Sequence, residues 1–117
     1  MTSNDATFHV RKMLGGVSII DISGEMTGAV EESLMTAYKE ASNGSTKTIM
    51  LNFERLVYMN STGIGLLITM LIRVQRHNQK LLAFGLSEHY QEIFELTRLN
   101  EAIGIYDSEA AALAAVA

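Results

Sequence analysis

Two hydroxyl side chains, those of Ser61 and Thr62, stand where a strand-like segment gives way to an apolar helix. Asn60, Ser61 and Thr62 are typical of a helix start, because their short side-chain oxygens accept from backbone N–H groups that have no intrahelical partner. The N-terminus of a helix also carries the positive end of the helix dipole, which stabilises negative charge. A single phosphate group would therefore be well placed on this segment.

Two glycines follow these hydroxyls, Gly63 and Gly65, although a helix cap does not require them. Each glycine inside a helix costs about 1 kcal/mol relative to alanine. Two of them in the first turns indicate that another backbone or a bulky partner approaches the helix closely. The alternative interpretation is that Ser61 and Thr62 only cap the helix.

The helix that follows has apolar residues at three- and four-residue spacing. This spacing predicts a buried face made of Ile64, Leu67, Ile68, Leu71 and Val74. At 100° per residue the opposite side holds Leu66, Met70, Arg73 and His77. Leu66 and Met70 either pack on a neighbouring helix or form the apolar part of a partner-docking surface beside Thr62.

The rest of the chain supplies the elements that would position this segment. A hairpin is predicted at residues 8–14 and 17–23 around Gly15 and Gly16, with Gly24 ending its second strand, which is apolar on both faces. Helices are predicted over 28–43, capped by Thr27, over 60–78, after Ser87 and after Asp107. Further strands are predicted at 48–53, with a connection after it, 80–84 and 103–106.

This order of elements predicts an α/β fold with a mixed sheet, in which an antiparallel hairpin is followed by parallel strands joined by right-handed crossovers. Ligands and partners of such sheets gather at the carboxyl ends of the strands. Residues 60–63 fall at such an end.

Composition narrows the class of protein. The chain has 117 residues, 48% hydrophobic and 19% charged, which predicts a single domain over 1–117, with residues 1–6 as a flexible N-terminus. A net charge of −4 argues against direct nucleic-acid binding. The longest apolar runs are about half of the ~20 residues that a membrane span needs, and no signal peptide is visible. We therefore expect a cytoplasmic protein without a membrane span.

The sequence offers no set of catalytic residues. There is no cysteine, and His9, His77 and His89 lack the spacing of metal ligands. Ser61 lacks the Gly-x-Ser-x-Gly elbow of serine hydrolases, and Gly63 and Gly65 are a weak match to a dinucleotide fingerprint. We therefore predict a protein that is not an enzyme and that holds no metal or cofactor.

The segment Asn60-Ser61-Thr62-Gly63-Ile64-Gly65 resembles the Asp-Ser-Ser-Gly-Leu-Gly signature of STAS domains of the bacterial anti-anti-sigma-factor type. The similarity extends along the chain. Ile22-Ser23-Gly24-Glu25-Met26 resembles the early Leu-x-Gly-Glu-Leu of the family, and residues 82–87 and 93–97 resemble its later strand and helix. The resemblance implies a STAS-like mixed sheet covered by about four helices.

The resemblance also implies a regulatory role in transcription, as an anti-sigma factor antagonist. The unphosphorylated chain would bind an anti-sigma factor with serine/threonine kinase activity and so free a sigma factor. The kinase, which would hold the ATP and Mg²⁺, would phosphorylate Thr62, with Ser61 as neighbour or minor acceptor, and a phosphatase would reverse this. The expected partner-binding residues are Asn60, Ser61, Thr62, Gly63, Gly65, Leu66 and Met70.

Two alternatives remain open from the sequence. One is a non-switching scaffold subunit of a stressosome or membrane-transport complex, in which the hydroxyls are only caps. The other is a small-ligand sensor that uses the cleft at the strand ends. Asn60 stands where many family members have Asp, which favours the scaffold. A homo-oligomer is compatible with any of these functions.

Overall fold

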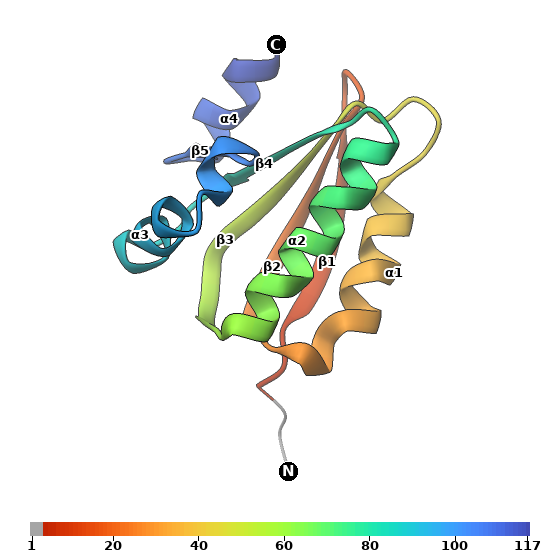
Figure 1. Cartoon of the computed structure of the whole chain (residues 1–117). Coiled ribbons are helices and arrows are strands. Elements are labelled where there is room, and N and C mark those ends of the chain that lie inside the picture. Colours follow the sequence, from red (N-terminus) through yellow and green to blue (C-terminus); the bar gives the residue numbers. More distant parts are fainter. Residues whose placement is uncertain (1–3) are drawn as a thin grey trace.

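The computed structural model describes residues 4–117 as a five-stranded sheet with helices on both faces (Figure 1). The strands lie in chain order and are β1 (Thr7–Met13), β2 (Val17–Met26), β3 (Thr48–Met59), β4 (Lys80–Phe84) and β5 (Gly104–Tyr106). β1 pairs antiparallel with β2, and all other neighbours are parallel. The predicted mixed sheet is thus confirmed.

Four α-helices and two short 3₁₀ helices connect and follow the strands. They are η1 (Gly28–Val30), α1 (Glu31–Ala41), α2 (Ser61–Arg76), α3 (Glu88–Leu96), η2 (Leu99–Glu101) and α4 (Glu109–Val116). The predicted helix over 28–43 therefore begins with a 3₁₀ turn. The hydroxyls of Thr27, Ser87 and Ser108 cap η1, α3 and α4.

The hairpin between β1 and β2 forms where two adjacent glycines allow it. Gly15 and Gly16 both have positive φ, 81° and 75°, which residues with side chains rarely adopt. Gly24 does not end β2, contrary to the prediction. It lies inside the strand at φ 112°, beside a shift in register, and a side chain there would meet the carbonyl of Asn4.

Residues 4–6 are part of the fold. The Ala6 N–H donates to the Glu25 carbonyl at 2.9 Å, the Glu25 N–H donates to the Asn4 carbonyl at 2.9 Å, and Ala6 is buried. The prediction of a flexible N-terminus over 1–6 is therefore wrong for these three residues, because they add a pairing to the end of β2. Residues 1–3 lie outside the described part of the chain.

β3 is twice as long as the apolar segment 48–53 that was predicted as the strand. Only Thr48 to Asn52 pair with β4, while the strand continues along β2 as far as Met59. The predicted connection after Phe53 is therefore strand. Because β3 outruns β4, its last residues have a neighbour on one side only, and Val57 and Tyr58 are exposed.

Two apolar cores lie on the two faces of the sheet. The larger core packs the sheet against α1, α2 and α3, and the smaller packs it against α4. Ile20 and Leu51 face the larger core, whereas Ile19 and Met50 face the smaller. This alternation of buried side chains confirms that β2 is apolar on both faces.

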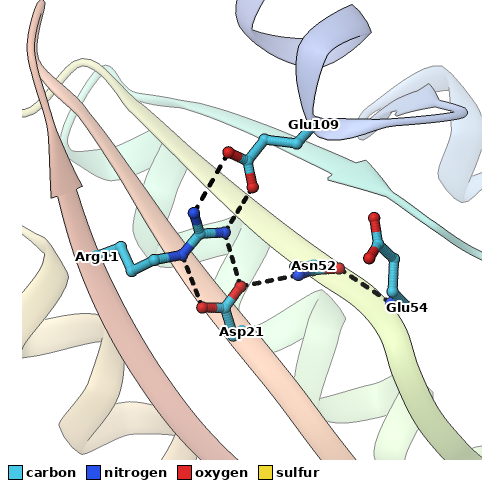
Figure 2. Close-up of polar contacts among 5 residues, drawn as sticks. All are labelled: Arg11, Asp21, Asn52, Glu54 and Glu109. Carbon is cyan, nitrogen blue, oxygen red and sulfur yellow. Dashed lines mark hydrogen bonds and ion pairs between the residues drawn. The ribbon is translucent and has the colours of Figure 1, made fainter.

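A polar cluster holds α4 to the sheet (Figure 2). The Arg11 guanidinium donates to Asp21 at 2.7 and 2.9 Å and to Glu109 of α4 at 2.6 and 3.3 Å. The Asn52 amide also donates to Asp21, at 2.8 Å. Burial alone would raise the pKa of Asp21, but the hydrogen bonds from Arg11 and Asn52 outweigh it and hold this pKa below its ordinary value.

Candidate functional site

The predicted site lies where the carboxyl ends of β2 and β3 meet. Met26 and Met59 are partners in the parallel register of these strands, and the Asn60 N–H donates to the Met26 carbonyl at 3.2 Å. The turn into η1 and the start of α2 are thus neighbours at one end of the molecule (Figure 1). The structure places Asn60 to Gly63 at the strand ends, as the sequence predicts.

Asn60 is the cap of α2. Its side-chain Oδ1 accepts the Gly63 N–H at 2.8 Å, and its carbonyl accepts the Ile64 N–H at 3.0 Å. The side chains of Ser61 and Thr62 are exposed, and neither hydroxyl makes a hydrogen bond within residues 4–117. The interpretation of these two hydroxyls as simple caps is therefore wrong, because Asn60 already fills that role.

Ser61 and Thr62 face different sides of the helix. The Thr62 methyl carbon Cγ2 lies so close to Gly28 of η1 that a Cβ at Gly28 would be 3.0 Å from it. Ser61 is one residue away and so points about 100° further around the helix axis. The Thr62 methyl group therefore contacts the turn after β2, while the residue as a whole is exposed to solvent.

The two glycines have different surroundings. Gly63 is buried, and a Cβ there would collide with the Met26 carbonyl. A backbone does approach closely, as predicted, but it belongs to this chain, so the expected contact between Gly63 and a partner is wrong. A Cβ at Gly65 would meet nothing within 4 Å. Of the two glycines, Gly65 is therefore the one at which the lack of a side chain leaves open space beside the helix.

Leu66 and Met70 belong to the core, which corrects their predicted place in a docking surface. Their exposed fractions are 6% and 0%, whereas Ile68, predicted to be buried, is 43% exposed. The buried residues of α2 are Gly63, Leu66, Leu67, Met70, Leu71 and Val74. The buried face is thus rotated from the predicted one. Thr62, which lies on the same side of α2 as Leu66 and Met70, packs against Gly28 of η1, and α2 also contacts α1.

Two apolar residues of α2 are exposed, Ile68 and Ile72, and Ile72 is 45% exposed. The sequence pattern did not predict that either of them is exposed. With Ser61 and Gly65 they follow at spacings of four, three and four residues, so they form one stripe along the helix. We call these four residues the α2 stripe. Thr69 and Arg76 could have revealed it, since a helical wheel puts these polar residues opposite Leu67 and Val74.

The helix that begins at Ser61 and Thr62 carries no acidic side chain. No Asp or Glu occurs between Glu54 and Glu88. The first N–H groups of a helix have no intrahelical acceptor, and Asn60 satisfies only that of Gly63. A phosphate on Thr62 would therefore meet the positive end of the α2 dipole and no carboxylate from α2.

Other kinds of site are not evident in the described residues. No group of three or more His, Cys, Asp or Glu side chains in 4–117 could hold a metal ion. No helix in this part of the chain has the length and apolar character needed to cross a membrane.

The chain belongs to the STAS domain family, whose model matches residues 10–112. Among curated proteins, it is 27% identical to the anti-sigma-B factor antagonist of Staphylococcus aureus (strain NCTC 8325 / PS 47) over 82 residues, which are 70% of this chain and 76% of that protein. It is 30% identical to the putative sulfate transporter YvdB of Bacillus subtilis (strain 168) over 88 residues. These are 75% of this chain but 17% of the transporter.

Solved structures share the fold. An anti-sigma factor antagonist from Mycobacterium paratuberculosis superposes with a TM-score of 0.82 at 19% identity, covering 98% of this chain and 97% of that one. The Bacillus cell fate determinant SpoIIAA in its phosphorylated form superposes with a TM-score of 0.68 at 22% identity, covering 95% of this chain and all of the other. The names of these relatives refer to antagonism of anti-sigma factors, to sulfate transport or to cell fate determination, and none denotes an enzyme.

Proposed function

We propose that this chain is an anti-sigma factor antagonist whose binding is switched by phosphorylation of Thr62. The observation that carries the proposal is that Thr62 is an exposed residue whose hydroxyl has no capping role, because Asn60 caps α2. A kinase can reach such a hydroxyl without unfolding the helix. The similarity to an anti-sigma-B factor antagonist supports the kind of partner.

Phosphorylation would act on the surface and leave the fold intact. A phosphate adds nearly two negative charges, and the free N–H groups at the start of α2 stabilise them. A partner docked on this end of the helix would instead have to bury an unpaired charge, which costs several kcal/mol. Because about 1.4 kcal/mol is a factor of ten in affinity, this cost is enough to expel the partner.

The docking surface in this proposal is the α2 stripe, Ser61, Gly65, Ile68 and Ile72. It begins beside Thr62, its middle lacks a side chain at Gly65, and its far half is apolar. A partner that packs along the whole stripe as far as Ser61 would therefore reach the residue next to the phosphorylation site. The partner would be an anti-sigma factor with serine/threonine kinase activity that supplies ATP and Mg²⁺, and a phosphatase would restore binding.

The proposal is tested by a phosphorylation assay. The full chain is incubated with ATP, Mg²⁺ and each anti-sigma factor kinase encoded near its gene, and the product is mapped by mass spectrometry. We expect one phosphate, on Thr62, in the wild type and in Ser61→Ala, and no modification in Thr62→Ala. Modification of Ser61 alone, with Thr62→Ala still fully modified, would overturn the choice of acceptor.

A non-switching scaffold is the second candidate function. It is favoured by the match to a sulfate transporter of which the matched region is a small part, and by Asn60, which gives the site no carboxylate. In that case no kinase would modify the chain. Binding to a larger assembly would also be insensitive to Thr62→Glu, whereas the switch requires this variant to weaken binding.

A further inference from the structure

The other end of α2 carries a second feature, a basic hollow between the last turns of two helices. Tyr38, Lys39 and Ser42 from the end of α1 and Arg73, Arg76 and His77 from the end of α2 line a space of about 520 Å³. Its size is within the range of small-molecule sites. Because α2 separates it from Thr62 by the full length of the helix, it is independent of the proposed switch.

The charge of the hollow contrasts with that of the chain. The protein carries a net charge of −4, yet three of its nine Lys and Arg residues line this one space, and none of its lining residues is acidic. Within residues 4–117, Lys39, Arg73 and Arg76 form no salt bridge. Glu40, the acidic neighbour of Lys39, lines a different hollow, on the β1 side of α1.

The usual structural role of these cations does not explain their arrangement. Lys39 lies in the last turn of α1, and Arg73 and Arg76 lie in the last turn of α2, where each interacts favourably with the negative end of a helix dipole. That role is fulfilled on any side of a helix end. It does not require the three side chains to surround one space, where they repel one another unless an anion is present.

Three polar side chains that line the hollow, those of Tyr38, Ser42 and His77, make hydrogen bonds within the chain. His77 Nδ1 lies 2.8 Å from the Arg73 carbonyl, which can only accept, so this nitrogen is the donor; the Tyr38 hydroxyl lies 3.4 Å from the same nitrogen. The Tyr38 hydroxyl donates to Gln79 Oε1 at 2.8 Å, and Gln79 Nε2 donates to Ser42 Oγ at 2.7 Å. The Ser42 hydroxyl hydrogen therefore remains available as a further donor.

We propose that this hollow binds the phosphate groups of a small phosphorylated ligand. Two guanidinium groups and one ammonium group supply three positive charges, and guanidinium groups match phosphate oxygens with paired hydrogen bonds. Ser42 adds a neutral donor. Such a set suits an anion with at least two negative charges, such as pyrophosphate or the diphosphate of a nucleotide.

The test is an NMR titration of the ¹⁵N-labelled full chain with sodium pyrophosphate and, separately, with ADP, at constant ionic strength set with NaCl. We expect saturable shifts of the amides of residues 38–42 and 73–79. Tighter binding of ADP than of pyrophosphate would identify a nucleotide, and equal binding would identify the phosphate groups alone as the recognised part. Absence of saturable shifts with both probes, or shifts confined to residues 60–63, would overturn the proposal.

Variants give a second readout. Arg73→Gln and Arg76→Gln remove side chains that are not buried, so both should retain the wild-type spectrum, and each should weaken pyrophosphate binding about tenfold. Arg55→Gln is the matched control, because it removes the same charge from an exposed position in β3. An equal loss in Arg55→Gln would show an effect of net charge and contradict a defined site.

Discussion

The side-chain oxygen of Asn60 accepts the backbone N–H of Gly63 at 2.8 Å, and this hydrogen bond defines the roles of the two hydroxyl residues between them. Because Asn60 caps α2, Ser61 and Thr62 are not needed for that purpose and remain exposed. Asn and Asp are about equally good caps, so Asn60 provides the capping geometry without a negative charge.

The cap predicts the behaviour of two variants of Asn60. Asn60→Ala should lower the free energy of unfolding by about 1 kcal/mol, because the Gly63 N–H loses its acceptor. Asn60→Asp should retain the stability of the wild type, since a carboxylate accepts the same bond at the positive end of the dipole. Urea denaturation followed by circular dichroism measures both. An Asn60→Ala variant as stable as the wild type would show that the cap is dispensable.

The two glycines predict opposite effects of the same substitution. Gly63→Ala should destabilise the fold by about 3 kcal/mol, because its Cβ collides with the Met26 carbonyl. Gly65→Ala should instead stabilise it by up to about 1 kcal/mol, since its Cβ enters open space in a helix. Thermal unfolding of the two variants compares them directly.

Gly65→Ala also tests the docking surface. If a partner packs on the α2 stripe, the added methyl group should weaken binding while the protein itself becomes more stable. Unchanged affinity in this stabilised variant would place the docking surface elsewhere.

The exposed isoleucines give a further prediction about binding. Ile68→Glu should leave the fold intact, because Ile68 is 43% exposed, and should weaken binding of the anti-sigma factor by about a hundredfold. Leu14→Glu is the control, since Leu14 is 98% exposed at the tip of the β1–β2 hairpin. Isothermal titration calorimetry would compare the two. A similar loss in both variants would point to a general effect of charge.

Much of the fold could be predicted because local sequence and tertiary context agree. The paired glycines of the first hairpin, the caps Thr27 and Ser87, and the apolar character of both faces of β2 each have a local cause that the structure confirms. β3 was predicted too short because its second half alternates weakly. That half is a strand because it pairs with β2 as far as Met59.

The sequence predicts that the candidate site lies at the strand ends, as the structure shows, but it predicts some of the surface residues of the site wrongly. The predicted buried face was centred on Ile64 and Leu71, although Thr69 and Arg76 indicate which side of α2 is exposed. Leu66 and Met70 lie on the side of α2 that Thr62 presents to η1 and are buried, whereas Ile68 and Ile72 are exposed. A capping role was open to Asn60, Ser61 and Thr62 alike, and only the geometry assigned it to Asn60.

The cluster around Arg11 was not predicted, since its members come from β1, β2, β3 and α4 (Figure 2). It implies a pH dependence of stability. Because the pKa of Asp21 is lower in the folded chain than in the unfolded chain, its ionised form stabilises the fold above about pH 4, and this stability is lost as the pH falls through the folded pKa.

Asp21→Asn should therefore lower stability at pH 7 by roughly 1 kcal/mol and flatten the acid limb of the stability curve. Urea denaturation at a series of pH values between 2 and 7 measures this, by the relation between stability and proton binding. Asp107→Asn, which alters an exposed carboxylate, should keep the slope of the wild type. An acid limb equally steep in Asp21→Asn would assign the pH dependence to other groups.

The central claim is that a phosphate on Thr62 ends the interaction with an anti-sigma factor. The most direct measurement is the dissociation constant of that complex for the unphosphorylated chain and for the chain phosphorylated on Thr62, determined by calorimetry under the same conditions. We predict a loss of affinity of about a hundredfold or more, with unchanged circular dichroism of the free chain. Equal dissociation constants for the two forms would contradict the switch.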